Sequence, residues 1–253
     1  MSSLAGTASH HNGYVFLHSR VPPSNRSFPA RPTSPLQRAL TLQLFPVGVT
    51  VNWAWSDGEH GGPWRVHRSR TTVLDGAKEP EEGYFATAFS ARNGVLELPE
   101  VTLKNVKWVA QALREHVTSP TPTGKDTRDP RIYLYVCTHG TRDCRCGDMG
   151  VAVLRGLREE ISKRGVADRV SVAEVAHVGG HKYAANVLVY PRGDWLADVS
   201  VEDVPGILNR ILDSPPHASP DDPPLCPQHW RGRMGLAKEA QLALYARYLQ
   251  SSN

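Results

Sequence analysis

The chain has 253 residues, of which 40% are hydrophobic and 21% charged, and its formal net charge is +4. This length and composition predict a globular protein with one large or two small domains. The basic residues are scattered, which gives no support to nucleic-acid binding, and no apolar run approaches the roughly 20 residues that a membrane-spanning helix needs.

At the N-terminus, the run from Met1 to Thr7 lacks the basic, apolar and small-residue order of a signal peptide, so we expect a cytoplasmic protein. The first half then predicts a strand, a helix, three strands and a closing helix. Ser34 is placed as the N-cap of the first helix, and Gln37 is placed to complete a capping box. The predicted strands are 14–17, 49–55, 84–89 and 95–98, and the closing helix is 102–115.

The second half predicts the same order of elements. A buried strand over 131–137 delivers Cys137 at its end, and Asp148 is placed to cap a helix that ends near Arg164 with Gly165 as its C-terminal cap. Strands over 170–175, 186–190 and 195–199 follow, and Ser200 begins the next helix. A Pro-rich loop over 213–229 leads to a last helix over 236–250.

The repeated order predicts an α/β protein built from two copies of one fold unit. We assign residues 1–117 to a first unit without cysteine, 118–128 to a linker, 129–213 to a second unit, and 214–253 to the loop and C-terminal helix. The first unit cannot perform cysteine chemistry, and we interpret its His10, His11 and His18 as surface or turn residues rather than ligands.

Two pairs of residues in the second unit indicate a metal centre. Cys137 and Cys146 stand in a run rich in Gly and Arg, and His177 and His181 bracket Val-Gly-Gly. Two thiolates and two imidazoles can hold a zinc ion or replace the four thiolates of an iron–sulfur cluster. Adjacent glycines argue against a regular helix, and they would let the backbone pass close to a bulky ligand.

Two other readings of these residues stay open. Zinc uses the same donor set, although eight residues between the cysteines exceed the usual two to four of a structural zinc site. A thiol–disulfide protein would use Cys144 and Cys146, because an intervening arginine lowers thiol pKa values. Cys226 is interpreted as a structural or incidental thiol.

The two motifs resemble those of a known family. The run from Val136 to Gly147 is similar to the cysteine motif C-x-H-x-x-R-D-x-R-C-G of the sucrase/ferredoxin-like family. The run from His177 to Gly193 is similar to its second motif, H-x-G-G-H-K-Y/F-A-x-N followed by Y-P-x-G. Leu4 to Thr7 and Trp230 to Leu236 fit family patterns more loosely, so the resemblance spans most of the chain.

The resemblance implies a thioredoxin-like fold, as in small 2Fe–2S ferredoxins. The two copies predicted from the element order are then two such units in tandem, the first one degenerate. It also implies a 2Fe–2S cluster held by Cys137, Cys146, His177 and His181, with Cys144 outside the ligand set. His139, Arg142, Asp143 and Lys182 are the candidates for orienting these ligands or adjusting their charge. The alternative for Arg142 and Asp143 is that they pair with each other and fix the loop.

The function implied is that of a one-electron carrier rather than an enzyme with its own substrate, and we find no paired acids that would support sucrose hydrolysis. Imidazole ligands raise the reduction potential above that of four-cysteine ferredoxins and couple reduction to proton uptake. We expect a protein redox partner, such as a flavin reductase, and no nucleic acid or membrane. The first unit is expected to shield the cluster or dock the partner.

Overall fold

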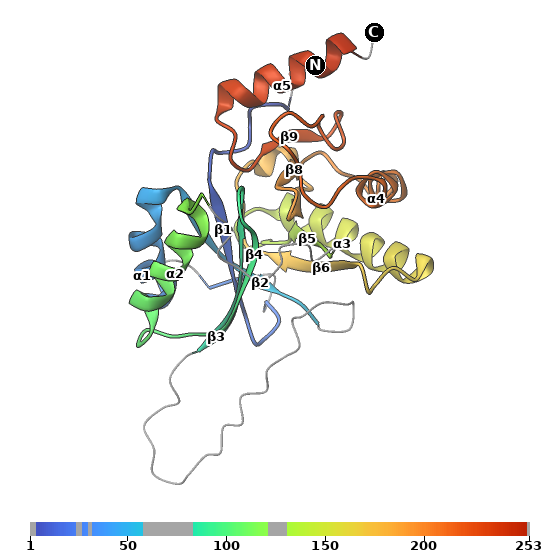
Figure 1. Cartoon of the computed structure of the whole chain (residues 1–253). Coiled ribbons are helices and arrows are strands. Elements are labelled where there is room, and N and C mark those ends of the chain that lie inside the picture. Colours follow the sequence, from blue (N-terminus) through green and yellow to red (C-terminus); the bar gives the residue numbers. More distant parts are fainter. Residues whose placement is uncertain (1–3, 24–26, 30–31, 58–82, 121–130, 252–253) are drawn as a thin grey trace.

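The computed structural model describes residues 4–23, 27–29, 32–57, 83–120 and 131–251 (Figure 1). Most of the predicted linker, 118–128, lies outside these ranges. The described part is a mixed α/β structure with five α-helices and one nine-stranded sheet. No helix in these ranges is both long enough and apolar enough to span a bilayer.

The described residues of the first half form four strands and two α-helices, close to the predicted positions. They are β1 (Gly13–His18), α1 (Pro35–Leu44), β2 (Val49–Trp55), β3 (Tyr84–Ser90), β4 (Gly94–Val101) and α2 (Val106–Thr118). The first helix begins as predicted, because the Ser34 hydroxyl accepts a hydrogen bond from the Gln37 backbone N–H at 3.2 Å. The Gln37 side chain does not close the capping box. It donates to the Val51 carbonyl and accepts from the Trp53 indole.

The second half contributes β5 (Ile132–Cys137), α3 (Cys144–Arg164), β6 (Val170–Val175), β7 (Val187–Tyr190), β8 (Asp194–Leu196) and α4 (Val204–Asp213). Asp143, not Asp148, caps α3, because its carboxylate accepts from the Arg145 N–H at 3.0 Å. The helix therefore begins earlier than predicted and includes Cys144 and Cys146. Gly165 ends it in the left-handed conformation, as expected.

The C-terminal segment differs most from expectation. The sequence predicted only a loop and a helix after 213, but residues Trp230–Arg233 form a strand, β9, which pairs with β8 at the edge of the sheet. Helix α5 (Lys238–Ser251) follows, near the predicted range. Four residues rich in arginine and glycine carry too little alternation to be recognised as a strand without a partner.

The strand order is β4-β3-β1-β2-β6-β5-β7-β8-β9. In each half the first two strands are parallel, and the third pairs antiparallel with the first and with the fourth. The halves join through β2 and β6, which pair only at Ala54–Val175 and Trp55–Glu174. Element order and strand pairing are thus the same in both halves.

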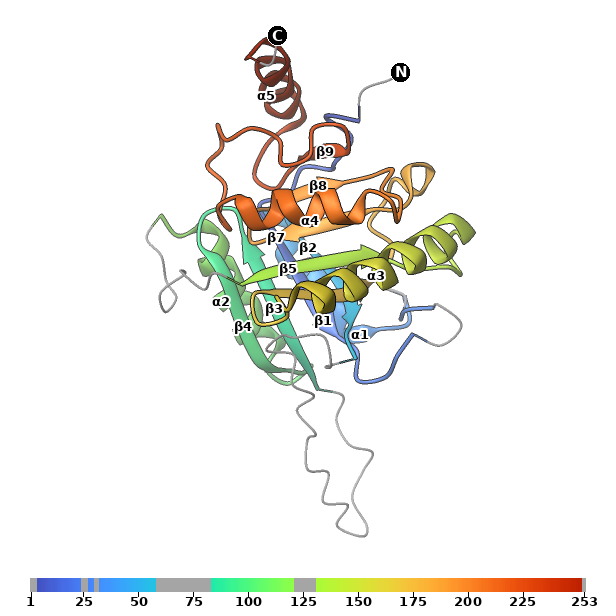
Figure 2. The same ribbon diagram turned by 90° about the vertical axis from the view of Figure 1, so that its right-hand side faces the viewer.

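Helices α1 and α2 lie on one side of the strands and α3 and α4 on the other (Figures 1 and 2). Each pair of helices covers its own apolar core against its own half of the sheet. The other faces of the two half-sheets meet in an aromatic layer, in which the rings of Phe16 and Tyr135 stack 3.6 Å apart and those of Phe89 and Tyr190 stack 4.5 Å apart. Cys137 and Cys146 belong to this layer, so the candidate site borders the contact between the halves.

Two histidines of the first half differ from the prediction. His11 and His18 are buried, with 3% and 8% of their surface exposed, rather than on the surface. Burial lowers the pKa of His11 to about 4 and that of His18 to about 3. Both rings are therefore neutral parts of the core at physiological pH.

Candidate metal centre

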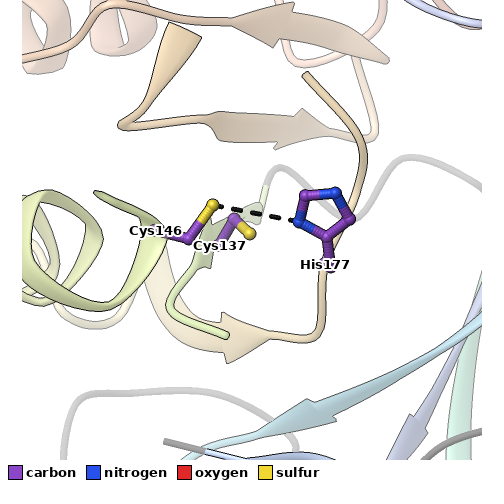
Figure 3. Close-up of side chains that lie close together, drawn as sticks. All are labelled: Cys137, Cys146 and His177. Carbon is purple, nitrogen blue, oxygen red and sulfur yellow. Dashed lines mark hydrogen bonds between the residues drawn. The ribbon is translucent and has the colours of Figure 1, made fainter. Parts of the chain in front are cut away.

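The two cysteines come from adjacent elements. Cys137 is the last residue of β5, and Cys146 lies in the first turn of α3 (Figure 3). Both are buried. Helix α3 packs so closely on the end of β5 that a Cβ at Gly150 would lie 2.0 Å from the Cys137 carbonyl oxygen. A glycine at this position therefore allows the two thiols to approach each other.

His177 comes from the loop after β6, and the base of this loop is held by the first half of the chain. The Ala176 N–H donates to the Trp53 carbonyl at 2.9 Å, and the Asn52 amide donates to the Ala176 carbonyl at 3.1 Å. The His177 ring points at the cysteines, with Nδ1 3.9 Å from the Cys146 Sγ (Figure 3). The ligand atoms of Cys137, Cys146 and His177 all lie within 4.8 Å of one another.

His181 lies beside this group of three but is not part of it. It begins a short 3-10 helix, His181–Tyr183, and its ring centroid is 5.5 Å from that of His177. Its side chain is 48% exposed, and its Nε2 lies 4.0 Å from a carboxylate oxygen of Asp143. Three of the four predicted ligands are thus together, and the fourth stands next to them at the surface.

The two thiols share one proton unequally. The hydrogen bond with Cys146 holds the pKa of Cys137 well below its ordinary value, against the effect of burial, and His177 adds to this. The same hydrogen bond and burial raise the pKa of the Cys146 thiol. Without a metal ion, the favoured state is a Cys137 thiolate beside a Cys146 thiol. A bound metal would take both as thiolates and release the proton.

Two of the four residues predicted to support the ligands contact them. The His139 Nδ1 accepts a hydrogen bond from the His177 backbone N–H at 3.2 Å, and burial lowers the pKa of His139, which keeps Nδ1 free to accept. Asp143 lies near His181, but its main partner is Arg145, whose guanidinium bonds lower the pKa of Asp143 to about 2. The proposed Arg142–Asp143 pair is therefore wrong.

The other two candidates are exposed. Arg142 lines a cavity of about 500 Å³ together with His139 and His177. The Lys182 ammonium lies 4.7 Å from the centre of the Tyr183 ring, which is a cation–π distance. Neither side chain is placed to orient an imidazole in this structure.

The remaining cysteines stand apart from the site. Cys144 is exposed whereas Cys146 is buried, because residues two apart in a helix point in different directions. This arrangement argues against a disulfide between them. Cys226 is buried in the core of the second half, where burial raises its pKa to about 12. It behaves as the structural thiol that the sequence predicts.

The donor chemistry fits both metals considered from the sequence. Two buried cysteine sulfurs and one or two imidazole nitrogens are donors for zinc and for an iron–sulfur cluster with histidine ligands. The sequence assigned no role to Asn186 and Arg231, which contact the histidine loop, although Asn186 is the asparagine of the second motif. The Arg231 guanidinium donates to the Gly179 carbonyl and to Asn186. The only signal for Arg231 was its place in the run Trp230 to Leu236.

Comparison with known proteins gives a family match over most of the chain. Residues 4–232 match the model of the family described as Sucrase/ferredoxin-like. Altered inheritance of mitochondria protein 32 of Meyerozyma guilliermondii is 40% identical over 82 residues, which are 31% of this chain and 29% of that protein. Actin patches distal protein 1 of Saccharomyces cerevisiae is 32% identical over 111 residues, 39% of this chain and 35% of that protein. The chain thus spans about a third of the length of these relatives.

Among solved structures, a thioredoxin-like 2Fe–2S ferredoxin from Aquifex aeolicus is similar to this chain. The sequence identity is 20% and the TM-score 0.30, over 33% of this chain and 81% of the ferredoxin chain.

Proposed function

The chain belongs to the sucrase/ferredoxin-like family, and we propose that it is a one-electron carrier with a 2Fe–2S cluster held by Cys137, Cys146, His177 and His181. The observation that supports this best is the convergence of two buried sulfurs and one imidazole nitrogen within 4.8 Å, with a second imidazole beside them. The cysteines would supply the thiolates and the histidines the neutral nitrogens.

The surroundings of these residues suit electron transfer. When bound, the cluster supplies a one-electron couple, and two imidazoles in place of thiolates raise its potential. The chain excludes water from Cys137 and Cys146, which are 1% and 0% exposed, and leaves the His181 ring 48% exposed. An electron would therefore leave or enter on the histidine side, where we expect a protein partner such as a flavin reductase. The cytoplasmic location remains a prediction.

We also infer that residues 1–117 and 129–213 are two thioredoxin-like units in tandem. The shared element order and strand pairing of the two halves support this inference. The first unit has no cysteine and packs its aromatic face against the second, beside the candidate site. Its role would be to shield one side of the cluster.

A zinc-stabilised binding module is the second candidate. One observation favours it: donor atoms within 4.8 Å of one another are close enough to surround a single ion. His181 would then complete a Cys₂His₂ set. Such a protein would be colourless and without a redox couple.

One preparation separates these proposals. The protein is purified without air, its visible spectrum is recorded, and iron, acid-labile sulfide and zinc are assayed. We expect a red-brown protein with iron and sulfide in equal amounts. Zinc in place of iron would support the binding module, and the absence of all three would leave a thiol protein.

Variants then test the ligand assignment. His177→Cys should keep a cluster and lower its midpoint potential, because a thiolate replaces a neutral ligand. Cys137→Ser should lose or cripple the cluster, and Cys144→Ser should change neither iron content nor potential. The wild-type midpoint should also fall as pH rises through the neutral range, since reduction takes up a proton. A midpoint that is independent of pH would argue against histidine ligation.

A further inference from the structure

A buried arginine far along the chain braces the loop that carries both histidines. Arg231 lies on β9 and is 3% exposed. Its Nη1 donates to the Gly179 carbonyl at 3.1 Å and to the Asn186 side-chain oxygen at 2.7 Å. The Asn186 amide donates in turn to the Gly180 carbonyl at 3.2 Å. The carbonyls of Gly179 and Gly180, which lie between the two histidines, are therefore both hydrogen-bonded from the same side of the loop.

The same guanidinium is fixed from its other side by the N-terminal segment. Its Nη2 donates to the Thr7 carbonyl at 2.7 Å, and its Nε donates to the Thr7 hydroxyl at 3.2 Å. Its central carbon lies 5.6 Å from the centre of the Trp195 ring. A planar group with donors in several fixed directions is needed for this combination, which a lysine ammonium cannot reproduce.

The two glycines of the loop have different reasons to be glycine. Both have positive φ, +84° at Gly179 and +71° at Gly180. A Cβ on Gly179 would meet nothing within 4 Å, whereas a Cβ on Gly180 would lie 2.6 Å from the Arg231 Nη2. The close neighbour of Gly180 is thus the Arg231 guanidinium.

Arg231 also differs from the other buried arginines in its charge balance. Arg192 and Arg233 both pair with Asp194, at 2.8 and 3.0 Å. Among the described residues, no carboxylate lies within ion-pair distance of Arg231. Burial lowers the pKa of Arg231, and the groups at Tyr183, Cys137 and Asp198, which are negative when ionised, act in the opposite direction.

We propose that Arg231 is the positioning residue of the 177–181 loop: its guanidinium holds the backbone between the two histidines so that the His177 ring faces the thiols with the His181 ring beside it, and its unpaired charge stabilises the reduced centre. The second part rests on the proposed function, whereas the first concerns the chain without any cluster.

The first part is tested on metal-free protein by amide hydrogen exchange of residues 177–183. Arg231→Lys should speed amide exchange in this loop at least tenfold, because one ammonium group cannot make all the hydrogen bonds of the planar guanidinium. Arg233→Lys is the matched control, since it makes the same change at the same depth on the same strand. It should leave the loop unchanged. Equal loop exchange in wild type and Arg231→Lys would overturn the proposal.

Two glycine substitutions provide a second test in case the Arg231 variants fail to fold. Gly179→Ala and Gly180→Ala both force an alanine to adopt a positive φ, so they cause similar backbone strain. Only the Cβ added at Gly180 collides with Arg231. Gly180→Ala should speed loop exchange at least tenfold more than Gly179→Ala. Equal effects of the two substitutions would mean that Arg231 does not hold the loop.

The charge is tested on the loaded protein at equal iron content. Arg231→Gln should lower the ratio of reduced to oxidised protein at a fixed potential at least tenfold, or 59 mV for one electron. Arg231→Lys keeps the charge and should shift the ratio far less, although it loosens the loop. Equal shifts in the two variants would refute the electrostatic part. If no iron is found but Arg231→Lys still speeds amide exchange in the metal-free loop, the cluster proposal fails and the positioning role of Arg231 stands.

Discussion

Gly150→Ala tests whether helix packing sets the separation of the two thiols. Gly150 lies in the middle of the contact between α3 and the end of β5, and an added Cβ would lie 2.0 Å from the Cys137 carbonyl oxygen. Ordinary contacts begin at 3.4 Å, so the helix would have to move by more than an ångström. The obstacle is backbone at the end of a strand, which cannot rotate away as a side chain can.

Two effects oppose each other in this substitution. Alanine in place of glycine stabilises a helix interior by about 1 kcal/mol. Overpacking costs about 1–3 kcal/mol, and we take the upper end because the clash is with backbone. The free energy of unfolding should therefore fall by about 2 kcal/mol. Cys146 moves with the helix, so metal retention should fall as well.

Gly156→Ala, in the same helix, is the matched control. Its Cβ would meet only the side-chain ends of Val201 and Val204, at 3.3 and 3.6 Å. This variant should be as stable as wild type or up to about 1 kcal/mol more stable. Urea denaturation of both metal-free variants gives the stability difference, and metal analysis gives retention. A Gly150→Ala protein within about 0.5 kcal/mol of Gly156→Ala, with full metal content, would refute the reasoning.

Two further predictions concern buried charge. Asp194→Asn removes the shared partner of two buried arginines, so it should lower the free energy of unfolding by about 3–5 kcal/mol in urea. Asp221→Asn breaks only an exposed ion pair and should cost less than about 1 kcal/mol. His18 titrates at about 3 when folded and near 6.5 when unfolded, so protons bind the unfolded chain first as pH falls below 6.5. The free energy of unfolding should therefore fall as the pH is lowered, and His18 accounts for about 2 kcal/mol of the loss at pH 5. The His18→Gln variant should lack this part of the pH dependence. Identical pH slopes for the two proteins would contradict the assignment.

Local sequence signals were enough for most elements. The alternation in 49–55 and the apolar run 170–175 appear as β2 and β6 with the predicted bounds. Ser34 and Gly165 act as the predicted caps, because capping depends on residues a few positions apart. The start of α3 was missed for a related reason. Gly147 and Gly150 weaken the helical signal, and Asp148 offers a second plausible cap.

The candidate ligands were also recognisable from spacing and residue type, since thiols and imidazoles are common metal donors and occur here in two close pairs. Spacing could not decide which of these side chains are buried at the site and which lie at the surface. Cys146 is buried and Cys144 exposed only because the helix begins at Cys144, and His181 stands beside the other three donors at the surface.

By itself, the sequence determined the order of strands and helices up to residue 213, the caps at Ser34 and Gly165, and the residues able to bind a metal, since these depend on neighbours in the chain. Only the tertiary structure decided that the two halves share one sheet and face each other across an aromatic layer, and that β9 completes the edge. It also placed Arg231 against Gly180, 51 positions earlier in the chain. Contacts of this kind depend on packing between distant segments, which leaves no periodic pattern in the sequence of either one.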